Sequence, residues 1–183
     1  MKILLVAGAF LAVASAGADC LPSNTYVGLF ADSGHSVMSV NYAGTATQFE
    51  LWIWWLPSER GLQAVEFGMT YPSNVIQSNI TCAVLGIGAC WWLNNSTCLA
   101  FDEGLCQMDW VWTHHQTCFL TDAMPSVIEI GPFSGMSEIE SYTCEAGYPA
   151  GPATIILNKL ALNQEDVIAV EPQSWGAIKN LYR

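Results

Sequence analysis

Short runs rich in Val, Ile, Phe, Tyr, Trp and Thr recur along this chain, separated by clusters of turn-forming residues. Such spacing is typical of an antiparallel β-sandwich or barrel. Hardly any segment before Gln173 has the periodicity of a helix. The pattern therefore predicts an all-β fold, an antiparallel β-sandwich. Strands are expected over residues 26–30, 36–41, 48–55, 63–71, 80–85, 107–112, 126–130, 138–143 and 154–162.

The run from Phe49 to Trp55 has the clearest alternation of side chains. A period of two places its members on two faces of a strand. One face carries Phe49, Leu51, Ile53 and Trp55, and the other carries Glu50, Trp52 and Trp54. We expect the first face to enter the core.

The two ends of the chain differ from its body. Residues 1–16 place Lys2 before an apolar run and then offer Ala14-Ser15-Ala16, a signal-peptide cleavage pattern that could extend to residue 18. Residues 20–171 are the size of one β-sandwich domain. Residues 172–183 begin with Pro172, and Ser174 can cap a short C-terminal helix. We expect a secreted or extracellular protein, with the periplasm and the cell surface left open.

Charge and hydropathy narrow the range of partners. The formal net charge of −11 at pH 7 repels phosphate backbones, so nucleic acid is not expected as a partner. The apolar run at the N-terminus is short for a retained membrane span. A protein or a glycan is the expected partner.

The seven cysteines of an exported chain indicate disulfides rather than metal ligands. Residues 82–106, where cysteines recur every eight positions, read as an insertion stapled by local bridges. The favoured pairs are Cys90 with Cys98, across an Asn94-Asn95 hairpin, and Cys106 with Cys144. Two alternatives are left open for the odd cysteine. Either the chain has three bridges and one buried thiol, or Cys20 forms an intermolecular bridge.

No catalytic or metal-binding constellation emerges from the sequence, and no cofactor is expected. The stretch from Asp32 to Ser36 contains His35 but lacks the nucleophile elbow of a serine hydrolase. His114 and His115 are adjacent on an expected strand and so point to opposite faces, a poor geometry for chelation. An enzyme is less expected than a binding protein.

Tryptophans supply the strongest functional hint. Trp52 and Trp54 share one strand face, and exposed rings on a sheet can form a platform for sugar rings. Trp110 and Trp112 share another face and are expected to point inward. Packing is the alternative role for all four rings.

The run from Gly61 to Pro72, which follows the alternating segment at residues 49–55, resembles the early strands of cohesin-like β-sandwich modules. Residues 174–183 are similar to a C-terminal segment of secreted bacterial proteins. The first resemblance implies a cohesin-like or immunoglobulin-like sandwich, a module that binds a partner domain through one sheet face. The expected function is a secreted, non-catalytic binding or structural module. The alternatives are a carbohydrate-binding module that uses Trp52 and Trp54, and a secreted hydrolase.

Overall fold

The computed structural model describes residues 21–82, 87–164 and 167–168. The expected signal peptide, Cys20 and the expected C-terminal helix lie outside these residues. The described part is all-β and contains no helix, as the hydrophobic pattern predicts. Its strands are β1 (Thr25–Phe30), β2 (Ser39–Val40), β3 (Thr47–Leu56), β4 (Ala64–Thr70), β5 (Val75–Cys82), β6 (Ile87–Leu93), β7 (Ser96–Phe101), β8 (Val111–Leu120), β9 (Ser126–Gly131), β10 (Glu140–Tyr142), β11 (Thr154–Ile156), β12 (Asn158–Leu162) and β13 (Val167–Ile168).

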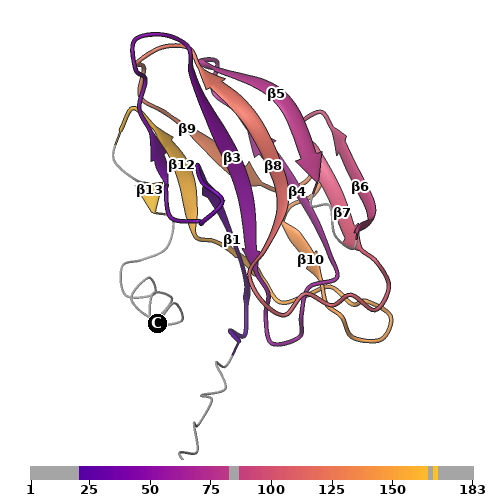
Figure 1. Cartoon of the computed structure of the whole chain (residues 1–183). Coiled ribbons are helices and arrows are strands. Elements are labelled where there is room, and N and C mark those ends of the chain that lie inside the picture. Colours follow the sequence, from indigo (N-terminus) through magenta and orange to yellow (C-terminus); the bar gives the residue numbers. More distant parts are fainter. Residues whose placement is uncertain (1–20, 83–86, 165–166, 169–183) are drawn as a thin grey trace, which may run out of the picture.

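The strands form two sheets that pack face to face (Figure 1). The five-stranded sheet has the order β11-β1-β3-β8-β5. The eight-stranded sheet has the order β13-β12-β9-β4-β7-β6, with β10 also paired to β4 and β2 to β12. Most pairs are antiparallel, while β1 pairs with β11 and β2 with β12 in parallel. The fold is a β-sandwich.

The core lies between the sheets and follows the alternation of side chains. The face of β3 that was expected to be buried is at most 7% exposed at Phe49, Leu51, Ile53 and Trp55. Val65, Phe67 and Met69 of β4 belong to the same buried cluster. The opposite face of β3 is less buried, so this strand sits as the sequence predicts.

The strand predicted from the sequence at residues 107–112 is wrong in its position, because β8 lies further along the chain. The strand runs from Val111 to Leu120 and pairs with both β3 and β5. Its inner positions include the polar residues Thr113, His114 and Gln116, all buried. A bulge opposite Ile53 and Trp54 turns both Thr113 and His114 inward, which breaks the alternation. Trp110 lies before the strand.

Residues 82–106, expected as an insertion, supply strands β6 and β7 to the eight-stranded sheet. These strands form a hairpin whose turn residues Asn94 and Asn95 have φ of 51° and 60°. Both values suit the tight turn that matches the twist of a hairpin. Five residue pairs join β7 to β4, so the hairpin is a continuous part of the eight-stranded sheet.

Candidate binding site

A groove runs over the outer face of the eight-stranded sheet, along the pair β4 and β7. Val65 and Leu99 point into the core, so their neighbours Ala64 and Ala100 point outward. Alanine has little bulk, and the sheet surface is hollow at these positions. The hollow has a volume of about 440 Å³ and is also lined by Tyr142 of β10.

A second hollow of about 340 Å³ lies two residues further along the same strands. Glu66 and Cys98 face each other there, between Ala89 and Trp91 of β6 and the side chain of Phe133. We call the two hollows together the β4–β7 groove. The small residues opposite Ala64 and Glu66 come from β7, a strand that the hydrophobic pattern does not predict.

Tyr142 and Cys98, which line the β4–β7 groove, both have raised pKa values. Tyr142 donates a hydrogen bond to Glu140 at 2.6 Å, and this bond together with burial raises the pKa of the phenol. Burial, followed by the nearby carboxylate of Glu66, raises the pKa of the Cys98 thiol to about 11. The thiol is therefore protonated at neutral pH and is a weak nucleophile. The arrangement suits recognition rather than covalent chemistry.

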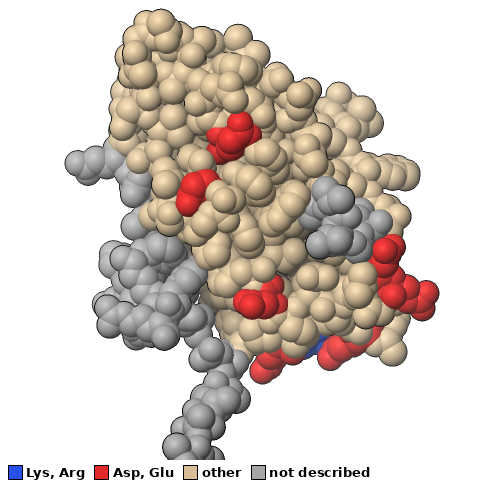
Figure 2. Space-filling view, in the orientation of Figure 1, with Lys and Arg blue, Asp and Glu red and all other residues tan. Residues whose placement is uncertain are grey.

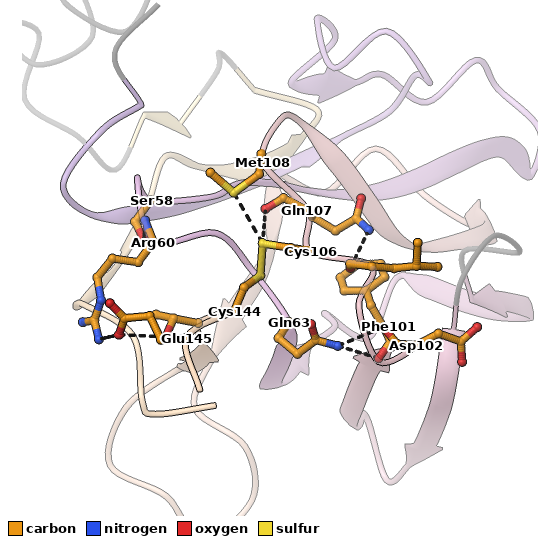
Figure 3. The surroundings of a disulfide bond; sticks show 12 residues. Ser58, Arg60, Gln63, Phe101, Asp102, Cys106, Gln107, Met108, Cys144 and Glu145 are labelled. Carbon is orange, nitrogen blue, oxygen red and sulfur yellow. Dashed lines mark hydrogen bonds and ion pairs between the residues drawn. A yellow bond between two sulfur atoms is a disulfide. The ribbon is translucent and has the colours of Figure 1, made fainter. Parts of the chain in front are cut away.

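A disulfide anchors one end of this groove (Figure 3). Cys106 and Cys144 are bonded, with Cα atoms 5.6 Å apart, in agreement with the pairing favoured from the sequence. Beside it, Gln63 donates from Nε2 to the main-chain oxygens of Phe101 at 2.7 Å and Asp102 at 3.2 Å. Gln63 and Phe101 line the first hollow, so the covalent link and these hydrogen bonds fix its wall.

An ion pair lies beside the Cys106–Cys144 bridge. Arg60 and Glu145 form a salt bridge next to Cys144 (Figure 3). The hydrogen bond from Arg60 lowers the pKa of the Glu145 carboxyl. Because both groups are solvated, the pair contributes to geometry more than to stability.

The Cys90–Cys98 pairing expected from the sequence is wrong. Cys90 is bonded to Cys82 of β5, with Cα atoms 6.5 Å apart. In the β6–β7 hairpin, Cys90 is opposite Leu99, and Cys98 is opposite Trp91. Cys90 and Cys98 are thus one residue out of register and point to opposite faces of the sheet. The described cysteines form two bridges, and Cys98 and Cys118 carry free thiols.

His114 lies beside the Cys82–Cys90 bridge, between the sheets. Its Nε2 is 2.9 Å from the Thr97 hydroxyl and 3.5 Å from the Cys90 sulfur. Burial lowers the pKa of the imidazole to about 3, so it is neutral. The ligand atoms of Cys82, Cys90 and His114 lie within 4.8 Å of one another, but sulfurs joined in a disulfide offer no thiolate to a metal. This interior group is structural.

Trp52 and Trp54 lie on the outer face of the five-stranded sheet, and both rings are half-buried. The ring of His115 stacks on Trp52 with centroids 4.0 Å apart. His35 lies against Trp54 at 4.8 Å and stacks on Trp110 at 4.8 Å. Figure 2 shows one side of the molecule, where scattered acidic groups interrupt a largely uncharged surface. The predicted ligand rings thus have imidazole neighbours that pack on them.

Asp32 shapes the loop that brings His35 to these rings. Its carboxylate accepts hydrogen bonds from the main-chain nitrogens of Ser36 at 2.8 Å and Val37 at 2.7 Å. Burial raises the pKa of Asp32, but these bonds outweigh it and lower the pKa overall. His35 adopts a φ of 44° within this turn. The Asp32–Ser36 stretch is therefore a hydrogen-bonded turn that positions an aromatic ring.

The chain matches no protein-family model, and a search of curated proteins gives no match. Solved structures with a similar fold are cohesin modules. The cohesin of a type I cohesin–dockerin complex from Clostridium thermocellum superposes with a TM-score of 0.53 at 11% identity, covering 78% of this chain and 94% of that one. The seventh ScaB type I cohesin of Pseudobacteroides cellulosolvens gives 0.55 at 10% identity, over 81% and 95% of the two chains.

A non-cellulosomal cohesin from the archaeon Archaeoglobus fulgidus gives a TM-score of 0.51 at 8% identity, over 84% of this chain and 97% of that one. At such identities the likeness concerns the fold alone. The chain has a cohesin-like β-sandwich fold, as the run from Gly61 to Pro72 suggested.

Proposed function

We propose that this cohesin-like β-sandwich is a secreted, non-catalytic module that binds a partner protein through the β4–β7 groove. The observation that carries the proposal is the groove itself, a hollow with an alanine floor and an aromatic and acidic rim on an open sheet face. Several of the similar structures are complexes of a cohesin with a dockerin, which supports a protein as the partner. The signal-like N-terminus and the disulfides support an extracellular location.

The chemistry of the groove favours a protein partner with a particular surface. Ala64 and Ala100 leave room for an aliphatic or aromatic side chain, since anchors of this kind fill pockets at interface centres. Glu66 and Glu103 line the two hollows with carboxylates. A partner that presents an apolar side chain flanked by lysine or arginine would complement both features.

Filling the groove tests the proposal. The wild-type protein is immobilised, the extracellular proteins of the source organism are passed over it, and the captured protein is purified and titrated. Ala100→Arg should weaken its affinity at least about tenfold, because the arginine occupies the floor of the first hollow. Ser78→Arg is the matched control, since Ser78 is exposed on β5 of the other sheet.

Equal affinity of the wild type and Ala100→Arg would exclude the groove as the binding site. Substrate turnover by the purified protein that is lost in His35→Ala would instead favour the hydrolase.

Carbohydrate binding by Trp52 and Trp54 is the second candidate function. It is favoured by the position of both rings on an outer sheet face, where they are only half-buried. A glycan array followed by a tryptophan fluorescence titration tests it. Quenching by a sugar that is lost in Trp52→Ala supports this candidate. A loss of stability in Trp52→Ala without any quenching sugar assigns the ring to packing against His115.

A further inference from the structure

Strand β6 forms one edge of the eight-stranded sheet, and within the described residues it pairs with β7 alone. The hairpin register sets Leu93 opposite Ser96 across the two-residue turn. In an antiparallel ladder such a pair exchanges hydrogen bonds, and the bonded pairs then recur at every second residue. The main-chain groups of Cys90 and Trp92 therefore point away from β7, toward the open edge.

This edge lacks the features by which proteins usually block strand pairing. Residues 87–101 contain no charged residue and no proline. The one irregularity lies between Ile87 and Ala89, at the start of the strand. From Ala89 to Leu93 the edge is regular and uncharged, which makes it a template for another strand.

Large apolar side chains also accompany the open edge. Trp91 is 75% exposed and Leu93 is 72% exposed. They point to the same face of the sheet because they are two residues apart. An added strand would bring its own side chains beside them and remove apolar area from water.

We propose that β6 is a self-association surface, where two copies of this chain pair antiparallel through residues 89–93 and join their eight-stranded sheets. A strand paired antiparallel with its own copy satisfies a two-fold axis, so Trp91 and Leu93 of one copy lie near those of the other. A net charge of −11 makes most encounters between copies repulsive. The uncharged hairpin is a region where that repulsion is weakest, which favours a second copy as the occupant.

The inference does not depend on the proposed partner binding, because the open main-chain groups of Cys90 and Trp92 are not part of the alanine floor of the β4–β7 groove. Trp91 also lines the second hollow, so Leu93→Lys is the variant that separates the two proposals. Ala100→Arg should leave self-association intact. Conversely, a protein that binds no partner can still form the dimer.

Analytical ultracentrifugation of the oxidised mature protein tests the proposal. The mass should rise with concentration toward twice that of one chain, and added salt should strengthen association by screening the acidic bodies. Leu93→Lys and Trp91→Lys should each restore a monomer, because lysine on an edge opposes pairing. Ile76→Lys is the matched control and should still dimerise, since Ile76 is 57% exposed on β5, the edge strand of the other sheet.

Hydrogen exchange separates edge pairing from stacking of sheet faces. The amides of Cys90 and Trp92 should exchange more slowly at concentrations where the dimer forms. A monomer at every concentration and salt would overturn the proposal. So would a dimer that persists in Leu93→Lys with the same circular dichroism, or one in which these two amides stay unprotected.

Discussion

The side chain of Asn158 binds both main-chain groups of Leu29, as a neighbouring strand would. Its Oδ1 accepts from the Leu29 nitrogen at 3.0 Å, and its Nδ2 donates to the Leu29 oxygen at 2.5 Å. Pairing of β1 with β11 ends at Val27 and Ile156, and the chain then leaves for β12 of the other sheet. Asn158 thus satisfies the strand groups that this departure leaves exposed inside the protein.

Asn158→Leu should lower the free energy of unfolding by about 3 kcal/mol, because it leaves the buried main-chain nitrogen and oxygen of Leu29 without hydrogen-bond partners. Asn158 is fully buried, so water cannot replace the lost bonds. Urea unfolding followed by tryptophan fluorescence measures the change. Asn79→Leu, at an exposed position of β5, is the control and should change stability little. Equal losses in the two variants would refute this role of Asn158.

Gly61→Ala should destabilise the protein more than Gly44→Ala does. Both glycines have a left-handed backbone, with φ of 72° and 90°, so both variants carry the conformational cost of about 1 kcal/mol. A Cβ on Gly61 would also meet the sulfurs of Cys106 and Cys144, whereas one on Gly44 meets no atom within 4 Å. The difference between the two melting temperatures reports this crowding. Identical melting temperatures would mean that the disulfide corner adapts without cost.

Removing the Cys106–Cys144 bridge should cost about 4 kcal/mol, the loop-closure value for a bridge between residues 38 apart in sequence. The variant Cys106→Ser with Cys144→Ser leaves the other bridge intact. Chemical unfolding without reductant gives the loss. The matched variant, Cys82→Ser with Cys90→Ser, should lose less from loop closure, because its cysteines are only 8 apart. The opposite order would show that packing of the Cys82–Cys90 bridge outweighs chain entropy.

The sequence predicts the faces of a strand well where one face is apolar throughout. Strand β3 is the example, since its inner residues from Phe49 to Trp55 are all aromatic or aliphatic. The pattern fails for β8, because buried His114 and Gln116 find polar partners elsewhere in the chain. The Thr97 hydroxyl forms a hydrogen bond with His114, and the Tyr71 hydroxyl donates to Gln116 at 2.6 Å. In a pattern of hydrophobic and polar positions, a buried polar residue whose partner is distant in sequence cannot be told from a surface residue.

The β4–β7 groove could not be predicted from the sequence for a related reason. Ala64 and Ala100 become neighbours only through the pairing of β4 with β7, and nothing local to either alanine signals a floor. The cysteines show the same limit. The hairpin turn at Asn94 and Asn95 was identified, but the choice of Cys98 for Cys90 ignored the register that places them on opposite faces.

The protein should lose stability in mild acid because of His114. Burial lowers the pKa of this imidazole to about 3, while the unfolded chain has a value near 6.5. The unfolded state therefore binds the proton first, and stability present above about pH 6.5 declines as the pH falls toward the folded value. The full slope of one such group is about 1.4 kcal/mol per pH unit.

His114→Phe should flatten this decline, because phenylalanine does not titrate and can pack against Phe67 and Trp92 as the imidazole does. Some slope should remain from His35, whose pKa burial also lowers. The readout is the free energy of unfolding in urea between about pH 6.5 and 4, compared as a slope so that the lost bond to Thr97 does not enter. The same slope in both proteins would mean that His114 gains its proton without unfolding, and the neutral buried imidazole would then be wrong.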